Sequence, residues 1–324
     1  MASSMAAERT PAQPDPGDPD PRAVRRAFGR AAASYDTAAV LQREVGDRLA
    51  SRLDLVRMVP ATVVDLGCGT GGALPMLAAR YPKARLVAVD AALPMLVAAG
   101  RRMPDRRPAL ARWIGRPAGG PALVCADATA LPFAARGVDL LWSNLMLQWV
   151  ADVPRAFAEF RRVLSVGGLL TFTTFGPDTL KELKGAYAAI DEPAHVHRFA
   201  DLHDLGDALV RAGFADPVMD METITVTYPT PRALLRELKS IGATHQALGL
   251  VRSEAIAVSE AGEPLDLTIR SFGIIRPTDM PAVTVTIEPD DGEPVNGSDA
   301  VFAAVAAAVW RHDGFASRWP TMRT

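Results

Sequence analysis

Apolar and polar positions alternate along the chain in blocks that predict strands and helices in turn. Short apolar runs rich in Val and Leu predict strands at residues 62–66, 85–89, 122–125, 138–143 and 168–174. Helical spacing of apolar residues predicts helices at 71–80, 92–102, 153–164 and 178–189. Strands that alternate with helices predict an α/β fold, with a mostly parallel sheet and helices on both of its faces.

The regions that flank this core have weaker but readable patterns. Residues 22–53 show helical spacing before the first strand, and residues 202–212, 219–228 and 231–242 predict a helix, a strand and a helix after the last one. Beyond residue 246 only short pieces remain: strand-like segments at 265–269 and 283–287, and an alanine-rich helix at 300–310. We therefore expect a disordered tail at 1–22, a catalytic domain at 23–246 and an atypical extension at 247–324.

Composition narrows the class of protein. A hydrophobic fraction of 49% over 324 residues is ample for a core, and a net charge of -2 gives no argument for a nucleic-acid partner. No apolar run approaches the roughly 20 residues that span a membrane, and the first 21 residues lack the apolar core of a secretion signal. Cys68 and Cys125 are too few for a disulfide framework or a zinc site, so we expect small core residues, no metal and a cytoplasmic location.

A glycine cluster follows the first predicted strand and has two interpretations. Gly67, Gly69 and Gly72 match the G-x-G-x-x-G fingerprint of dinucleotide sites. Asp65, Gly67, Gly69 and Gly71 instead form D-x-G-x-G-x-G, which resembles the first motif of class I S-adenosylmethionine-dependent methyltransferases. The glycines alone do not decide between the two.

Three aspartates that follow predicted strands favour the second interpretation. A carboxylate at Asp65 would repel a pyrophosphate over the turn, whereas it would attract the sulfonium and ammonium of S-adenosylmethionine. Asp90 ends the second strand and can accept hydrogen bonds from ribose hydroxyls, a feature that NAD enzymes share. Asp127 follows the third strand, where similar methyltransferases place an acidic residue near the adenine amino group. A turn or N-cap role explains any one of them, but three at the carboxyl ends of strands point to a ligand site, to which we add Asn144.

Five further segments resemble one family, the malonyl-[acyl-carrier protein] O-methyltransferases of biotin synthesis. They are residues 28–36, 143–149, 174–183, 197–201 and 239–245. The glycine motif is widespread among methyltransferases, whereas S-N-L-x-x-Q-W, H-R-F and K-x-I-G-A-T-H are far more specific. The resemblance covers residues 23–246 and implies a Rossmann-like class I methyltransferase, S-adenosylmethionine as cofactor, and methyl transfer to the free carboxylate of malonyl-acyl carrier protein or malonyl-CoA. It also implies that the methylated product primes pimeloyl synthesis. We expect the protein to be a monomer.

Chemistry suggests roles for a few side chains on the substrate side. A malonyl carboxyl group has a pKa of about 4, so it is already a nucleophile at neutral pH and needs no general base. Arg198 is the candidate to hold it, since a guanidinium matches a carboxylate, although a surface salt bridge explains Arg198 equally well. Tyr35 is the candidate to cover the methyl site, although ordinary packing also explains it. His197 and His245 are candidates to line the substrate side, although a lone histidine is more often structural. Arg232, Arg236 and Lys239 share a helix face that would suit an acidic carrier protein, or simply faces solvent.

The chain departs from the family pattern at its end. Family members close with a short strand beside the one expected at 219–228, and we identify no such ending after His245. Either the piece at 265–269 replaces it, or an extension or frame change has altered the C-terminus. The alternatives to the leading interpretation are a methyltransferase of another small carboxylate, a protein arginine hydroxylase similar to complex I assembly factors of this fold, and a non-catalytic binding protein.

Overall fold

The computed structural model describes residues 19–103, 120–188, 199–226, 228, 230–243 and 265–277. The helices are α1 (Pro21–Ala31), α2 (Tyr35–Ala38), α3 (Val40–Arg52), α4 (Leu74–Arg80), α5 (Leu93–Arg102), α7 (Val153–Val163), α8 (Lys181–Ala188), α9 (Leu202–Arg211) and α10 (Pro231–Ser240). The strands are β1 (Thr62–Leu66), β2 (Arg85–Asp90), β3 (Ala122–Cys125), β4 (Val138–Ser143), β5 (Leu164–Phe175), β6 (Phe214–Val226) and β7 (Leu265–Pro277).

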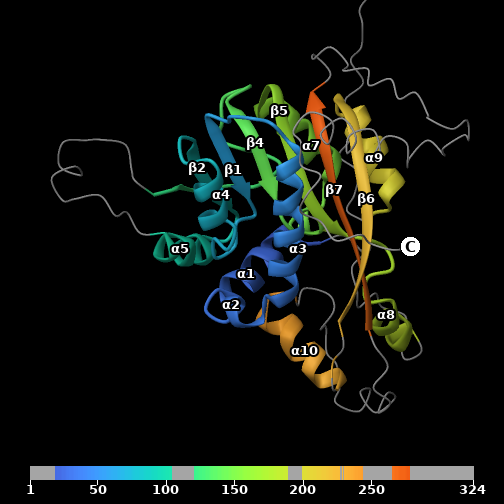
Figure 1. Cartoon of the computed structure of the whole chain (residues 1–324). Coiled ribbons are helices and arrows are strands. Elements are labelled where there is room, and N and C mark those ends of the chain that lie inside the picture. Colours follow the sequence, from blue (N-terminus) through green and yellow to red (C-terminus); the bar gives the residue numbers. More distant parts are fainter. Residues whose placement is uncertain are drawn as a thin grey trace, which may run out of the picture.

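The strands form one sheet in the order β3-β2-β1-β4-β5-β7-β6 (Figure 1). The first five pair in parallel, and β7 runs antiparallel to both of its neighbours. The chain moves outward in one direction from β1 to β3 and in the other from β4 onward, so a topological switch point lies between β1 and β4. Ligands of open α/β sheets bind at such a point, outside the carboxyl ends of the strands. The predicted α/β fold class is confirmed.

The sheet extends beyond the boundary expected at residue 246. β7 pairs with β5 from Leu170↔Ile275 to Phe175↔Ile269, and with β6 along nearly its full length. The strand-like piece predicted at 265–269 is therefore part of a longer strand that fills the place of the family's closing strand. At the other end, α1 begins at Pro21, inside the segment assigned to the tail, because the Asp20 carboxylate caps its first turn by accepting from the Arg22 amide.

Apolar side chains pack on both faces of the sheet. On one face, four phenylalanines pack together from α7 and the strands β5 and β6; they are Phe157, Phe160, Phe172 and Phe214. On the other face, Leu49 of α3, Leu53 directly after α3 and Leu77 of α4 pack around Val63 and Trp142. Because side chains alternate along a strand, Asp65 of β1 lies on this second face, between Val64 and Leu66, which face the phenylalanines.

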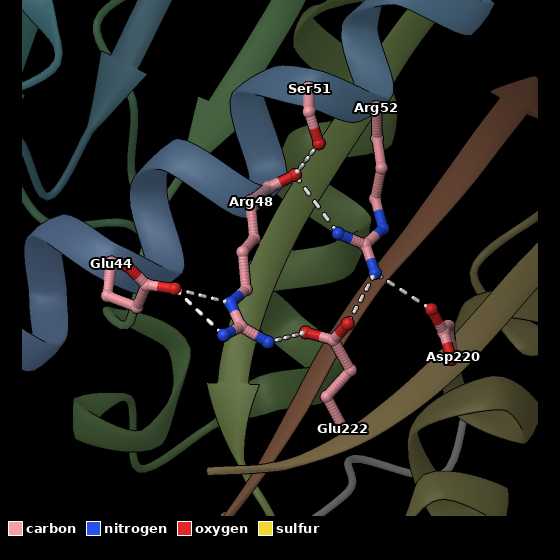
Figure 2. Close-up of polar contacts among 6 residues, drawn as sticks. All are labelled: Glu44, Arg48, Ser51, Arg52, Asp220 and Glu222. Carbon is pink, nitrogen blue, oxygen red and sulfur yellow. Dashed lines mark hydrogen bonds and ion pairs between the residues drawn. The ribbon is translucent and has the colours of Figure 1, made fainter. Parts of the chain in front are cut away.

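The N-terminal segment is broken into three helices rather than continuous as predicted. α3 lies along the second face of the sheet, and an ion-pair network joins it to β6 (Figure 2). Arg52 contacts Asp220 at 2.9 Å and Glu222 at 3.5 Å, while Arg48 contacts Glu222 at 3.1 Å and Glu44 at 2.8 Å. The network ties α3, and with it the start of the domain, to a strand more than 160 residues later in the chain.

The two cysteines differ from each other. Cys68 is a buried free thiol, as predicted, whereas Cys125 at the end of β3 is exposed, so its predicted burial is wrong.

Within the residues that the structure describes, no helix is both long and apolar enough to cross a membrane.

Candidate active site

The loop after β1 distinguishes the two interpretations of the glycine cluster. Gly67, Gly69 and Gly71 adopt φ values of 72°, 53° and 80°, a region that side chains disfavour. A Cβ at Gly71 would lie 3.2 Å from the Ala99 backbone and 2.7 Å from a Leu74 methyl group, whereas a Cβ at Gly72 would meet nothing within 4 Å. The three glycines that the backbone requires are those of D-x-G-x-G-x-G.

Two cavities open at the carboxyl ends of the parallel strands. One, of about 230 Å³, lies under α1 and includes Asp90 and Asp127; the other, of about 480 Å³, lies against α3 and includes Asp65. Both are lined by Tyr35, Gly67, Gly69 and Asn144. An elongated ligand can therefore occupy both cavities across the glycine loop.

Asp90 is positioned by the backbone at the end of β2. Its carboxylate accepts hydrogen bonds from the Gly69 amide at 2.9 Å and the Ala92 amide at 2.8 Å. Burial raises the pKa of Asp90, and these backbone hydrogen bonds oppose the rise. The side chain thus ties the glycine loop to β2 while it faces the smaller cavity.

Asp127 both caps a turn and faces the smaller cavity. Its Oδ1 accepts from the amide of Thr129 at 2.9 Å and from the hydroxyl of Thr129 at 2.8 Å. The turn role that the sequence left open is therefore present, and it fixes the carboxylate at the cavity wall rather than competing with a ligand role.

Asp65 is a buried carboxylate with an unpaired oxygen. It is 2% exposed, and its Oδ2 has no hydrogen-bond partner among the described residues. Burial, assisted by the carboxylate of Asp90, raises the pKa of Asp65 to about 7. A buried unpaired carboxylate is costly, so its position on the wall of the larger cavity points to a cationic ligand group.

Asn144 faces both cavities, but its amide is committed to protein partners. Its Nδ2 donates to the Gln42 carbonyl at 2.8 Å, and its Oδ1 accepts from the Thr173 hydroxyl at 2.8 Å. Asn144 thus holds α3 and β5 together at the mouth of the site.

Tyr35 lies where the two cavities meet. Its ring is 3.8 Å from the position of a Cβ on Gly69, and Phe28 lies beside it at 6.5 Å between ring centroids. Trp149 packs edge-on against Phe28 at 5.2 Å and completes this aromatic wall. Burial and the carboxylates of Asp90 and Asp36 raise the pKa of the Tyr35 hydroxyl, so it stays protonated at neutral pH.

One cluster at the site was missed by the sequence analysis. Asp36, next to Tyr35, accepts from the Thr70 hydroxyl at 2.5 Å and pairs with Arg102, which also donates to the Thr70 carbonyl at 3.0 Å. The cluster ties α2 to the glycine loop and to α5. Asp36 and Thr70 lie inside motifs that were recognised, but nothing local in the sequence indicates that Arg102 would join them.

The remaining predicted substrate residues lie outside the described part of the chain. These are His197, Arg198 and His245. Their proposed roles stay predictions.

The residues that are described fit S-adenosylmethionine. Gly67 and Gly71 leave no room for a side chain, and Gly69 between them adopts a positive φ, so a ligand can approach this stretch of backbone. The carboxylate of Asp90 lies beside it, where a ribose could be bound, and the unpaired buried oxygen of Asp65 suits a cationic group.

Comparisons with known proteins agree with this geometry. A family model described as a methyltransferase domain matches residues 64–172. A malonyl-[acyl-carrier protein] O-methyltransferase of Laribacter hongkongensis is 53% identical over 71% of this chain and 76% of its own length. One of Gallionella capsiferriformans is 48% identical over 71% and 77%. The crystal structure of the YcgJ protein of Bacillus shares 17% identity over 71% of this chain and 97% of its own, with a TM-score of 0.47, a likeness too weak to add to the assignment.

The family that the sequence motifs predicted is confirmed by the relatives, whose similarity spans more than two thirds of both chains. The chain belongs to the malonyl-[acyl-carrier protein] O-methyltransferase family and is an S-adenosylmethionine-dependent methyltransferase.

Proposed function

We propose that the protein methylates the free carboxylate of malonyl-acyl carrier protein and so primes pimeloyl synthesis for biotin. The relatives carry this activity in their names. On this chain the proposal is supported most by the position of Tyr35, which lines both cavities where they meet; burial raises the pKa of its hydroxyl, which favours a hydrogen-bond donor over a base at this point. A carboxylate substrate suits such a site, because with a pKa of about 4 it arrives already ionised.

In this proposal each of the three carboxylates binds a different part of the cofactor. Asp90 takes the ribose hydroxyls, Asp127 the adenine amino group, and Asp65 the cationic methionine end, with Gly67, Gly69 and Gly71 as the cradle and Asn144 at the mouth. The bound cofactor supplies an electrophilic methyl group on a sulfonium. The protein supplies position: it holds the acceptor in line and keeps water out.

Tyr35, Arg198 and His197 make up the substrate side in this proposal. The Tyr35 hydroxyl donates a hydrogen bond near the methyl position, and its ring lies beside Phe28, which itself packs against Trp149. Arg198 holds the malonyl carboxylate and His197 lines its path. Changing Arg198 to Ala should then raise the KM for the malonyl substrate strongly and leave cofactor affinity unchanged. A loss of cofactor affinity instead would contradict this role.

The decisive experiment measures the mass of the acyl carrier protein before and after the reaction. Purified protein is incubated with S-adenosylmethionine and malonyl-acyl carrier protein, and the carrier is analysed by mass spectrometry. The expected result is the gain of one methyl group that mild ester hydrolysis removes. No gain, with cofactor binding intact by calorimetry, would overturn the proposed acceptor, and a gain of oxygen on a protein arginine would identify the hydroxylase alternative.

We also propose that the protein acts as a monomer in the cytoplasm. The thiols of Cys68 and Cys125 are free, as in a reducing compartment. Sedimentation of the purified protein tests the monomer.

A further inference from the structure

α1 presents a stripe of arginines on its outer face. Arg22, Arg25, Arg26 and Arg30 fall three and four residues apart, so they share one side of the helix, and all four are exposed. Val24, Ala27 and Ala31 occupy the opposite side and are buried. The stripe is therefore the solvent face of an amphipathic helix.

The four arginines of this stripe form no ion pair with a described carboxylate. Neither α1 nor α5 contains an Asp or Glu, and the N-cap residue Asp20 is bonded to the backbone amide of Arg22. Other arginines do pair with carboxylates, as Arg48, Arg52 and Arg102 do. A concentration of unbalanced positive charge on a chain of net charge -2 marks α1 as a surface for an anionic partner.

An apolar stripe runs beside the arginines. α5 packs against α1, as Figure 1 shows, and a Cβ placed on Gly29 would lie 3.4 Å from the Pro94 ring. Leu93 and Val97 lie one turn apart on α5 and are 61% and 48% exposed, and exposed Arg101 follows one turn later. The two helices together form a basic edge next to an apolar strip, which matches a helix that carries carboxylates beside apolar side chains.

The surface also leads to the active site. A groove of about 560 Å³ between α1 and the start of α5 is lined by the four arginines, and Arg25 lines both this groove and the smaller cavity. The rival basic face, on α10, carries Arg232, Arg236 and Lys239 together with Glu237, and none of its residues lines the groove or either cavity.

We propose that the face formed by α1 and α5 (Arg22, Arg25, Arg26, Arg30, Leu93 and Val97) is the docking surface for the acidic acyl carrier protein. This inference rests on the proposed function and adds where its protein substrate binds. A carrier docked there lies beside the cofactor site, because Arg25 lines both the groove and the smaller cavity.

The test compares charge reversals of equal size. R22E/R26E alters the proposed surface, and R232E/R236E alters the rival one. The control is K83E/R85E, a pair of exposed residues at the amino end of β2, the sheet edge opposite the cavities. Affinity for unacylated holo-acyl carrier protein is measured by calorimetry at low and high salt, with cofactor affinity measured on the same samples.

R22E/R26E should weaken carrier binding by about tenfold or more at low salt, and the difference should shrink at high salt because the attraction is screened. Its cofactor affinity should stay unchanged, which shows that the variant is folded. K83E/R85E should change carrier binding by less than about twofold. The apolar strip is tested by V97S, which removes apolar surface without adding charge, and for which we expect weaker binding that salt does not restore.

Wild-type carrier affinity in R22E/R26E, or a comparable loss in R232E/R236E alone, would overturn the docking surface while methyl transfer to malonyl-acyl carrier protein stands. Failure of the unaltered protein to bind the carrier at all would overturn the docking surface, and failure to methylate it would overturn the proposed function. The two proposals therefore fail separately.

Discussion

Asp65 of β1 and Trp142 of β4 are register partners across the centre of the sheet, and each has a buried polar atom without a partner among the described residues. The Asp65 Oδ2 is an unpaired acceptor, and the Trp142 Nε1 is an unpaired donor. Both side chains line the larger cavity. Two neighbouring unsatisfied groups are costly to stability, so their presence at this point marks a binding site rather than a packing defect.

The raised pKa of Asp65 predicts a pH-dependent cofactor affinity. A cation prefers the ionised carboxylate, but with a pKa of about 7 in the free protein Asp65 is largely neutral below that pH. The affinity for S-adenosylhomocysteine, whose amino group remains cationic, should therefore rise as pH increases from about 5.5 to 7 and then level off, by up to about tenfold per pH unit. Calorimetry at several pH values measures it.

Replacing Asp65 by Asn should flatten that profile and weaken binding at neutral pH. The same variant should be more stable without ligand, because Asp65 binds a proton more tightly in the folded state than in the unfolded one. Its ionisation therefore costs stability between about pH 4 and 7. We expect a gain of about 2 kcal/mol in the free energy of unfolding at pH 7.5. An unchanged pH profile in the variant would assign the titration to another group, such as Asp90.

The glycine loop gives a matched pair of substitutions. Gly71→Ala forces a side chain into a φ of 80° and against the Ala99 backbone, so it should cost about 1–3 kcal/mol of stability and abolish cofactor binding. Gly72→Ala meets open space and should stay within about 0.5 kcal/mol of the parent. Urea denaturation and calorimetry on both variants check this, and equal effects would contradict the assignment of the motif.

The same two glycines show what the sequence can and cannot reveal. Spacing placed the loop between a strand and a helix correctly, because periodicity and glycine content are local signals. The glycine spacing could not choose Gly71 over Gly72, because the choice depends on Ala99, which lies on α5, beyond α4 and β2. The parallel core was predictable for the same local reason, and the pairing of β7 was not: β7 inserts between β5 and β6, an order that no local pattern encodes.

For the carboxylates of the site, too, local sequence signals predicted the positions but not the interactions. Asp65, Asp90 and Asp127 could be found from their positions at strand ends, whereas the unpaired Oδ2 of Asp65 required the packed structure. Arg102 joins the site through Asp36, 66 residues earlier in the chain, and through the carbonyl of Thr70, 32 residues earlier, so no local sequence pattern predicted it.

The ion-pair network of α3 and β6 predicts unequal effects for its two arginines. The Arg52 side chain is 16% exposed and contacts two carboxylates, whereas that of Arg48 is 41% exposed. Arg52→Ala should therefore cost about 1–2 kcal/mol, because it leaves Asp220 and Glu222 partly buried without that partner, and Arg48→Ala should cost less than about 0.5 kcal/mol. Urea denaturation at low and high salt measures both, and equal losses would show that burial does not set the strength of these pairs.

Tyr35→Phe isolates the hydroxyl at the junction of the two cavities. The ring keeps its place beside Phe28 and over Gly69, so cofactor affinity and stability should change little. If the hydroxyl donates to a group at the methyl position, kcat should fall by about tenfold, as expected for one lost hydrogen bond in the transition state. Because the raised pKa keeps Tyr35 protonated, the parent and the variant should share one pH profile between about pH 6 and 9. A variant with full activity would reduce Tyr35 to a packing role, and an alkaline limb lost on substitution would show that Tyr35 acts as a base.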